Sequence, residues 1–427
     1  MLIDIEDELN IPKDYHNFLK YPYIYMDFKK KYLKYKTKYL ELKKQIGSGC
    51  SFTELETLKK KMNEKDDSSK KEVYVNKNNG NRYIKYDSYL CGEGSYKKVW
   101  AGFDIKNNSL IALNKVDIKG ADELKRFDNE ILLLDNLDHP NILKLKDYWT
   151  DQGKHILITE IIDNNTLDKH YKENSKKIIN SLREHIIQIL NAIDYIHKEN
   201  IIHRDIKPDN IGINNDQIKI MDFGLSTKYL SPKKLNIPRL SRASSLTSDF
   251  ELTSMGTPVY MAPEMFQDNL KYSENVDIYA FGHTILELIL SIKPYDKLIK
   301  NLSNATATNI AVLVSKYQSK IFDLYNEYKK SNKESTLNEI LRLEYEKYIS
   351  DDEDKNTPEK IQKYVYDLNP KLKEIIDISI SNVDNRLSAE ALLNIYTDKK
   401  NINDYKKVVE EDFKHSTVDD IFGPPPS

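Results

Sequence analysis

The sequence predicts an α+β fold with two lobes. From Tyr83 to about Ile162, short strand-like segments surround one helix-like segment. Beyond Asn164 the pattern becomes mostly helical, with polar motifs in the loops between helices. Because sheets and helices that follow one another along a chain segregate into separate layers, we expect a small strand-rich lobe and a larger helical lobe. The predicted units are residues 1–82 (helical extension and linker), 83–162 (first lobe), 163–397 (second lobe, with an insertion at about 296–366) and 398–427 (tail).

Composition and charge argue against several classes of protein. Lys and Arg number 65 against 67 Asp and Glu, a formal net charge of −2, so no overall field favours nucleic acid or a membrane surface. The most apolar run, Ile278 to Ile292, carries His283 and Glu287, which predicts a buried helix and no transmembrane segment. The two cysteines, Cys50 and Cys91, lack metal-type spacing, so we expect no zinc site or disulfide scaffold, and a reducing compartment fits.

The first 82 residues predict a helix followed by a linker. Apolar residues recur at steps of four and three from Phe28 to Ile46, which indicates one apolar seam on a helix. The lysines between them leave two interpretations open: contact with an anionic surface, or docking on the chain's own globular part with the lysines solvated. Residues 64–81 are polar and indicate a linker before the first strand.

The beginning of the chain also bears on location. The acidic start, residues 1–7, is unlike a secretory signal peptide, so we expect a cytoplasmic protein. The lead segment resembles N-terminal stretches in proteins of giant DNA viruses. That resemblance would place the protein in the host cytoplasm or in the virion.

A glycine motif follows the first predicted strand. It reads Gly92-Glu93-Gly94-Ser95-Tyr96-Lys97-Lys98-Val99. Residues without Cβ let backbone N–H groups approach phosphate oxygens closely, but such pairs also serve ordinary tight turns. The motif alone leaves both interpretations open.

Three further motifs follow in order: His203-Arg204-Asp205-Ile206-Lys207-Pro208-Asp209-Asn210, Asp222-Phe223-Gly224 and Ala262-Pro263-Glu264. With the glycine motif they resemble the phosphate loop, catalytic loop, metal-binding triplet and activation-segment end of protein kinases, over about Tyr83 to Tyr396. The resemblance implies the bilobal protein kinase fold, with a small antiparallel β-sheet lobe and a larger helical lobe. It also implies an enzyme that uses ATP and Mg²⁺ and acts on a protein substrate.

The resemblance assigns a role to individual residues. Asp205 would accept the proton of the attacking hydroxyl, and Lys207 would steady the transferred phosphoryl group. Asn210 and Asp222 would supply hard oxygen ligands to Mg²⁺. Thr159 would lie at the back of the adenine pocket. The nucleotide site would consist of Gly92, Gly94, Lys97, Val99, Ala112, Thr159, Glu160 and Ile162, with backbone groups of Glu160 and Ile162 facing the base.

One position departs from the usual kinase pattern. A typical kinase has its phosphate-holding lysine two residues after the alanine of the third strand, where this chain has Asn114. Strand alternation puts Ala112 and Asn114 on one face and Lys115 on the other, unless a one-residue bulge shifts the facing. At the third glycine position stands Lys97, whose compact ammonium on a four-carbon stem would reach the phosphates. This exchange resembles With-No-Lysine kinases.

The same resemblance makes Glu130 the helix carboxylate of the active site. Lys97 is its expected ion-pair partner, and solvent or another partner in an inactive state is the alternative. Phe223 stands where that family usually has the leucine of an inhibitory chloride site, so chloride regulation is not carried over.

Further motifs concern specificity and control. Lys207 together with Gly256-Thr257-Pro258 resembles Ser/Thr kinases, so a Ser or Thr hydroxyl is the expected acceptor. Arg204 would receive a phosphate on the activation segment, because a guanidinium binds phosphate bidentately. Thr253 and Ser254 are the candidate phosphorylation sites.

Two structural roles also follow from the resemblance. Asp277 should brace the backbone of the catalytic loop. Arg386 should pair with Glu264.

Two other functions stay open. Asn114 breaks the usual lysine motif, which would suit a nucleotide-binding pseudokinase without transfer activity, although intact Asp205, Asn210 and Asp222 argue against it. Alternatively, the N-terminal helix or the insertion would dock a partner and the remaining domain would be a scaffold.

Overall fold

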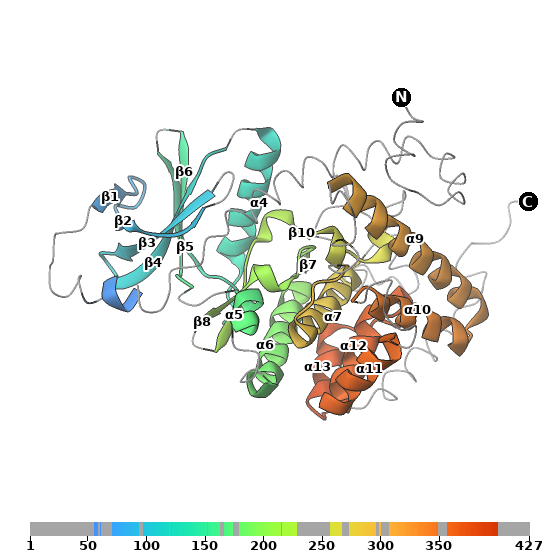
Figure 1. The fold of residues 1–427 in the computed structure, drawn as a ribbon. Coiled ribbons are helices and arrows are strands. Elements are labelled where there is room, and N and C mark those ends of the chain that lie inside the picture. The colour runs from blue at the N-terminus through green and yellow to red at the C-terminus, as the bar shows by residue number, and fades with distance from the viewer. Residues whose placement is uncertain are drawn as a thin grey trace, which may run out of the picture.

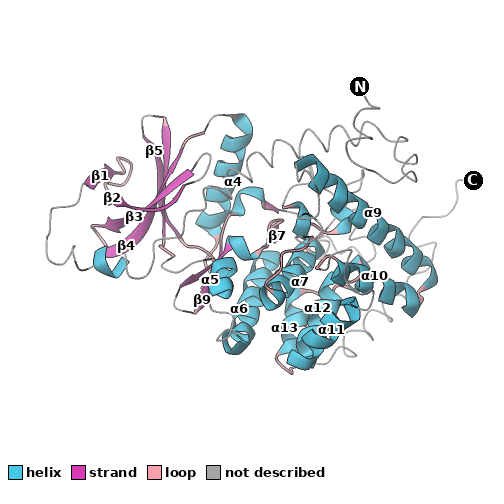
Figure 2. Cartoon of the chain, in the orientation of Figure 1, coloured by secondary structure: helices cyan, strands magenta, loops and turns pink. Residues whose placement is uncertain are grey.

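The structure of the protein, a computed structural model, has two lobes (Figure 1). It describes residues 55–58, 60, 71–93, 97–118, 120–151, 153–162, 166–173, 179–214, 216–228, 257–266, 273–295, 299, 307–348 and 357–399. A sheet with one helix beside it forms the first lobe, and a larger group of helices forms the second (Figure 2). The predicted α+β fold of two lobes is confirmed.

The first lobe is a six-stranded antiparallel sheet in the order β1-β2-β3-β4-β6-β5. Its strands are β1 (Lys71–Val75), β2 (Arg82–Glu93), β3 (Lys97–Asp104), β4 (Ser109–Val116), β5 (Leu145–Asp151) and β6 (Lys154–Thr159). On one face, Val116 and Leu157 share a hydrophobic core with Phe127 of helix α4 (Ala121–Asn136). On the other face, Leu113 packs with Trp149. Strand alternation therefore gives β4 two buried faces with different neighbours.

Strand β1 extends this sheet into a stretch that the sequence predicted to be linker, so that prediction is wrong for residues 71–75. The turn between β1 and β2 is tied to β5 by the carboxylate of Asp147. That carboxylate accepts hydrogen bonds of 2.8–3.2 Å from the side-chain amides of Asn76, Asn79 and Asn81. Polar side chains that would suit a solvated linker instead fasten an additional strand to the sheet.

A short helical segment at residues 55–58 also packs on the first lobe. Leu55 and Leu58 are buried in a cluster with Tyr86, Tyr89 and Ala101 of the sheet. Part of the predicted extension therefore belongs to the core of the first lobe. The apolar seam predicted from Phe28 to Ile46 lies outside the described residues.

The bond at Cys91 differs from expectation. Cys91 lies near the end of β2 and is disulfide-bonded. The sequence did not predict this bond.

The second lobe is mainly helical. Its helices are α5 (Leu167–Glu173), α6 (Ile179–Lys198), α7 (Asn275–Leu290), α9 (Ala307–Ser331), α10 (Glu334–Glu346), α11 (Thr357–Leu368), α12 (Pro370–Ile380) and α13 (Ala389–Tyr396). Its short strands are β7 (Ile201–Ile202), β8 (Ile211–Asn214), β9 (Gln217–Ile220) and β10 (Thr227–Lys228). Its 3₁₀ turns are η2 (Pro208–Asn210), η3 (Phe223–Leu225), η6 (Pro258–Tyr260), η7 (Pro263–Phe266) and η8 (Val383–Asn385).

Helix α7 forms the centre of the second lobe. Every residue from Val276 to Leu288 is buried, so the predicted buried helix is confirmed. Gly282 permits the close approach of α12, because a Cβ at this position would lie 2.6 Å from the Cγ2 atom of Ile380. Among the described residues, no helix is both long and apolar enough to cross a membrane.

The predicted insertion is helical wherever the structure describes it. Helices α9 and α10, and most of α11, lie within residues 296–366. In Figure 1, α9 runs along the side of the helical lobe that faces away from the sheet. Ile321 and Tyr325 of α9 pack with Ile340 and Leu343 of α10, so the two helices form a pair with its own small core.

Candidate active site

Strands β2 and β3 bracket the glycine motif. Gly92 pairs with Val99 across the two strands, and the register of β2 shifts between Lys85 and Gly92. Such shifts bend a strand, here just before the glycine motif. Gly94, predicted to line the nucleotide site, lies outside the described residues. The strand pairing thus fixes the two ends of the predicted phosphate loop.

Lys97 and Glu130 form an ion pair across the first lobe. Lys97 is the first residue of β3, and its Nζ lies 3.4 Å from Oε1 of Glu130 on α4. The lysine side chain is 25% exposed and the glutamate side chain 6%. Burial raises the pKa of Glu130, with a further increase from Asp222, while the neighbouring Lys97 ammonium opposes both. The expected partner of Glu130 is therefore the one observed.

Asn114 and Lys115 lie on opposite faces of β4. The buried amide of Asn114 donates hydrogen bonds to the backbone carbonyls of Ala112 at 3.3 Å and Leu157 at 3.1 Å. The Nζ of Lys115 instead donates to the hydroxyl of Tyr74 on β1 at 2.8 Å. Pairing of β3 with β4 runs in continuous register from Lys97 to Asp104, so no bulge in that ladder turns Lys115 toward Asn114. The prediction that Lys115 faces away is confirmed.

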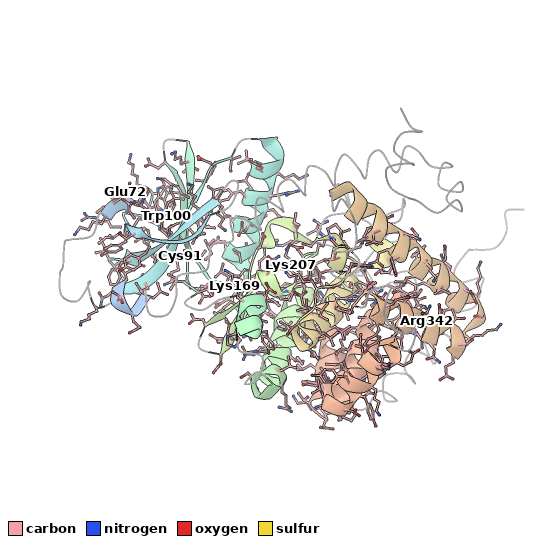
Figure 3. The ribbon with its side chains drawn as sticks, viewed as in Figure 1. Glu72, Cys91, Trp100, Lys169, Lys207 and Arg342 are labelled. Carbon is pink, nitrogen blue, oxygen red and sulfur yellow. The ribbon has the colours of Figure 1, made fainter. Side chains whose placement is uncertain are left out.

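Asp205 and Lys207 of the catalytic-loop motif meet Thr257 at one point. The Nζ of Lys207 donates to Oδ2 of Asp205 at 2.6 Å and to Oγ1 of Thr257 at 2.6 Å. Thr257 donates from both its backbone N and its hydroxyl to Oδ1 of Asp205, at 2.9 and 2.8 Å. Burial lowers the pKa of Lys207, but the adjacent Asp205 carboxylate outweighs it, and the net pKa is raised. Lys207 is therefore held as a cation in contact with Asp205. Figure 3 places it between the lobe that contains Trp100 and the helical region that contains Arg342.

Asn210 completes this cluster. Its Nδ2 donates to the carbonyl oxygen of Asp205 at 2.9 Å and to Oδ2 of Asp205 at 2.7 Å. Because the amide nitrogen makes both bonds, Oδ1 is the atom left to serve as a ligand. An amide oxygen together with a carboxylate from Asp222 matches the hard donors that Mg²⁺ requires, so the residues present fit that ion.

The Asp222-Phe223-Gly224 triplet has an unusual backbone. Asp222 adopts the left-handed conformation, with φ 65° and ψ 70°. Phe223 is fully buried, with its ring centroid 4.8 Å from that of His203 in an edge-to-face arrangement. Nδ2 of Asn129 on α4 donates to the carbonyl of Phe223 at 3.3 Å, so the triplet is linked to the same helix that carries Glu130. Contacts from both lobes, by Asn129 and by His203, therefore hold the triplet in place.

Thr159 and the residues after it connect the two lobes. Thr159 is buried at the end of β6 and pairs with Ala112 of β4. The carboxylate of Glu160 accepts from the backbone N of Lys144 at 2.7 Å and from Nζ of Lys219 at 2.9 Å. The N–H of Glu160 donates to the carbonyl of Lys144, which leaves only its carbonyl for a base.

Ile162 packs against the second lobe. A Cβ on Gly212 of β8 would lie 3.0 Å from Cγ2 of Ile162, so the glycine permits a close approach. The chain therefore runs from Thr159, which pairs with Ala112 in the sheet, to Ile162, which contacts β8.

A family model described as the protein kinase domain matches residues 87–395, well over half of the chain. The chain belongs to the protein kinase domain family. "Serine/threonine-protein kinase WNK" of Caenorhabditis elegans is 33% identical over 250 residues, which cover 54% of this chain and 12% of the relative. "Serine/threonine-protein kinase WNK8" of Arabidopsis thaliana is 33% identical over 234 residues, 52% of this chain and 38% of the relative. The chain thus spans less than half the length of these two relatives.

Two predicted structural roles within the kinase domain are confirmed. The Asp277 carboxylate accepts hydrogen bonds of 2.8 Å from the backbone N of His203 and of Arg204, which braces the catalytic loop. Arg386 donates to both carboxylate oxygens of Glu264, at 2.5 and 3.3 Å.

The Arg204 side chain contacts backbone just after the Asp222 triplet. Its Nε donates to the carbonyl of Leu225 at 2.5 Å. Thr253 and Ser254, the predicted phosphorylation sites that this arginine would serve, lie outside the described residues.

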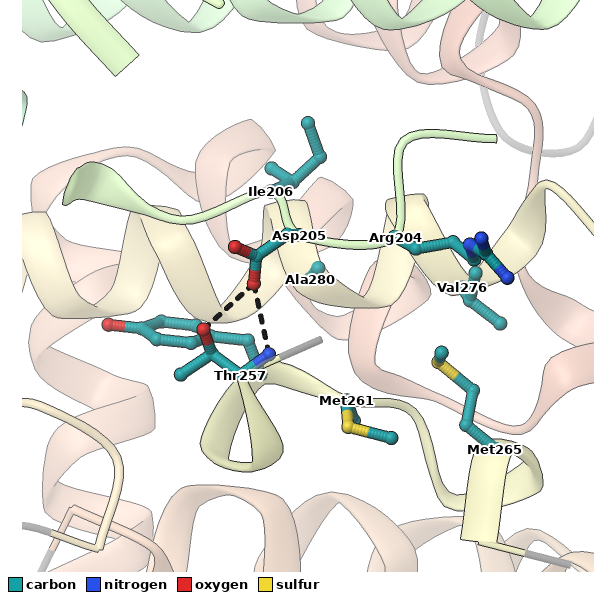
Figure 4. A pocket seen from close by; sticks show the side chains of 9 residues that line it. Arg204, Asp205, Ile206, Thr257, Met261, Met265, Val276 and Ala280 are labelled. Atoms are coloured by element: carbon teal, nitrogen blue, oxygen red, sulfur yellow. Dashed lines mark hydrogen bonds between the residues drawn. The ribbon is translucent and has the colours of Figure 1, made fainter. Parts of the chain in front are cut away.

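A small pocket opens beside the catalytic loop (Figure 4). Thr257 is joined to Asp205 across it by two hydrogen bonds, while the side chain of Arg204 extends away from Asp205. The wall opposite the catalytic loop comes from the segment that contains Thr257, Tyr260, Met261 and Met265. This segment, residues 257–266, is thus a direct neighbour of the predicted catalytic aspartate.

The sequence did not single out Thr257 as a site residue, although it lies in the quoted Gly256-Thr257-Pro258 motif. It also missed an acidic cluster around Lys293. The Nζ of Lys293 lies 3.0 Å from Asp209, 3.7 Å from Glu287 and 3.8 Å from Asp168. Asp168 and Asp209 lie far in the sequence from Glu287 and Lys293, so local spacing gave no signal for their meeting.

Proposed function

We propose that this chain is a serine/threonine protein kinase that transfers the γ-phosphate of ATP to a Ser or Thr hydroxyl of a protein. The observation that supports this most directly is the contact of Asp205 with Lys207, Asn210 and Thr257. Asp205 accepts the proton of the attacking hydroxyl and orients it. The names of the two relatives, both serine/threonine-protein kinases, agree with this proposal.

In this proposal Lys207 balances charge on the transferred phosphoryl group. Its raised pKa keeps it cationic, and its contact with Thr257 fixes its direction. Asn210 and Asp222 would hold Mg²⁺, which would supply positive charge next to the phosphate oxygens. Asp222 also contributes to the raised pKa of Glu130, so a bound cation would relieve repulsion between two carboxylates.

We propose further that Lys97 takes over the phosphate-holding role, as in With-No-Lysine kinases. The geometry in its favour is the 3.4 Å ion pair with Glu130, combined with a neutral Asn114 and an outward Lys115. Glu130 keeps Lys97 directed inward from the start of β3. A compact ammonium needs reach more than orientation, so a loop-borne lysine can serve.

The nucleotide would lie between the lobes. Gly92, Gly94, Lys97 and Val99 cover its phosphates, while Ala112, Thr159, Glu160 and Ile162 surround the base. Because the N–H of Glu160 is already used, its carbonyl is the group that faces the base. Phosphorylation of Thr253 or Ser254 would supply the anion for Arg204.

The test compares autophosphorylation, and phosphorylation of a generic protein substrate, among wild type, Lys97→Met, Lys115→Met and Asp205→Ala. We expect Lys97→Met and Asp205→Ala to lose about 100-fold or more in rate, because each removes charge at the reacting phosphate. Lys115→Met should keep wild-type activity within about threefold, since Lys115 lies on the face of β4 opposite to Asn114 and contacts Tyr74 of β1.

Two outcomes would overturn the assignments separately. Activity that survives Lys97→Met but is lost in Lys115→Met would refute the relocated lysine and leave the kinase itself intact. Wild type that stays inert with ATP and Mg²⁺, even after treatment with another kinase, would make the chain a pseudokinase.

A further inference from the structure

Helix α9 holds the segment that forms the wall opposite Asp205. The Nε2 of Gln318 on α9 donates a hydrogen bond of 2.8 Å to the carbonyl of Met261. It also lies 3.3 Å from the hydroxyl of Tyr279 on α7. Gln318 is fully buried, so both contacts are shielded from water. A buried amide that loses its partners is costly, which makes this position demanding.

A second contact from the same helix reaches the end of that segment. Two turns after Gln318, the hydroxyl of Tyr325 accepts a hydrogen bond of 3.0 Å from Nη2 of Arg386. Arg386 in turn donates to both carboxylate oxygens of Glu264. Gln318 and Tyr325, seven residues apart, lie on one face of α9. One helix face therefore holds Met261 directly and Glu264 through one arginine.

Helix α10, which packs against α9, is fixed to α7 by charges that are fully buried. Glu344 accepts hydrogen bonds from the hydroxyl of Tyr279 at 2.9 Å, and Lys347 donates to both Glu344 and Tyr279. Glu344 also pairs with His283 of α7 at 3.0 Å. Removal of one member of a buried ionic set leaves an unpaired charge, so such a set tolerates only one arrangement of its helices.

Movement of Met261 would be transmitted to the catalytic loop over a short path. Met261 follows the 3₁₀ turn η6, in which the N–H of Tyr260 donates to the carbonyl of Thr257 at 2.9 Å. Thr257 donates two hydrogen bonds to Asp205. Because residues 257–266 lie directly beside Asp205, we expect a protein substrate whose hydroxyl meets Asp205 to contact this segment.

We propose that Gln318 and Tyr325 are positioning residues for the protein substrate, acting through residues 257–266. In this proposal, helix α9 supports the surface that binds the protein substrate and is not merely a separate docking surface. This inference rests on the proposed kinase function. It predicts that the contacts of α9 affect the KM for protein substrate and leave the KM for ATP unchanged, because the nucleotide lies on the other side of Asp205.

The test uses the full chain with Gln318→Met, which keeps the volume but removes the donor, and Tyr325→Phe, which removes only the hydroxyl. Asn326→Ala, at an exposed position of α9, is the matched control. We expect the KM for a protein substrate to rise about tenfold in each of the first two variants, with the ATP KM within twofold, since sub-ångström misplacement is enough for such effects. Amide exchange of residues 257–266 should accelerate in both.

Every outcome bears on the proposal. If the variants fold and both the KM for protein substrate and the amide exchange are unchanged, the proposal is overturned. If the KM for protein substrate and the KM for ATP rise equally, Gln318 and Tyr325 contribute only to the stability of the fold, and the proposal also fails. If Gln318→Met does not fold, Tyr325→Phe decides alone. If wild type transfers no phosphate, the proposed function fails, whereas the exchange measurement still tests whether α9 holds the segment.

Discussion

The side-chain amide of Asn114 donates a 3.1 Å hydrogen bond to the backbone carbonyl of Leu157 on the neighbouring strand. Asn114 lies two residues before Val116, the cross-strand partner of Lys97, so Asn114 and Lys97 share one face of the sheet. That face packs on α4, where Glu130 is located. The neutral residue Asn114 is thus buried on the same face of the sheet as Lys97. Among the described residues, Lys97 is the only partner observed for Glu130.

A swap of the two positions should recover activity. In a Lys97→Met background, Asn114→Lys returns an ammonium to the face that packs on α4. We expect about tenfold more phosphotransfer from the double variant than from Lys97→Met alone, because a charge at this site contributes at least about 1.4 kcal/mol. Single-turnover rates with ATP and Mg²⁺ measure it. A folded double variant that is no more active than Lys97→Met would count against the shared face.

The hydroxyl of Thr257 should matter more than its methyl group. Thr257→Val removes both the donor to Asp205 and the acceptor for Lys207, so we expect kcat/KM to fall about 30-fold, or about 2 kcal/mol. Thr257→Ser keeps the hydroxyl and should retain most of the activity. Equal losses in the two variants would show that packing, and not hydrogen bonding, is the contribution of this residue.

The Glu264 and Arg386 pair should stabilise the fold. Arg386→Met leaves a buried carboxylate without its partner, so the free energy of unfolding should drop by about 3–5 kcal/mol. Adding Glu264→Gln removes the stranded charge and should restore a large part of that loss. Urea unfolding of the single and double variants measures both. If the double variant is as unstable as the single one, charge pairing is not the main contribution.

Glu287 should make stability depend on pH. Burial raises the pKa of Glu287 from its ordinary value of 4.5 to about 7. Lys293 and Tyr260 oppose this rise, and Asp168 and Asp209 add to it. Between pH 4.5 and 7 the folded state keeps a proton that the unfolded state has lost, so this contribution to stability is present at low pH and disappears as pH rises.

Its control is Glu287→Gln, which is neutral at every pH. Relative to that variant, wild type should lose up to about 3 kcal/mol of unfolding free energy between pH 4.5 and 7.5, from a shift of about 2.5 pKa units. Urea titrations at several pH values give the two curves. Curves that run parallel would show that Glu287 ionises normally in the fold.

Features carried by local pattern were predictable from the sequence. Strand alternation predicted that Lys115 faces away from Asn114, and the most apolar run of the sequence predicted the buried helix α7. Motif resemblance gave the pairing of Arg386 with Glu264, which lie 122 residues apart. These predictions succeed because either the periodicity of a strand or helix, or a motif of the family, specifies the position of each residue.

Contacts between distant segments with no such pattern were not predictable. Gln318 and Met261 are 57 residues apart, and nothing in the composition of α9 marks one amide as buried. Glu344 and Lys347 are charged residues at helical spacing, which usually indicates a solvated face, yet both are fully buried. Tertiary packing overrides the local preference in these places.

The extra strand β1 has a consequence for where this domain can be cut. The family match begins at residue 87, but β1 pairs along β2 from Lys71, and the three asparagines that follow it hold Asp147. A fragment that starts at residue 87 would lack β1 and also residues 82–86 of β2, which pair with β1 on one side and with residues 102–104 of β3 on the other. It would leave that end of β3 open to pairing with another chain, and Asp147 without its amide donors. A fragment for expression should therefore keep β1, and one that also keeps Leu55 and Leu58 would retain their buried contacts with β2 and β3.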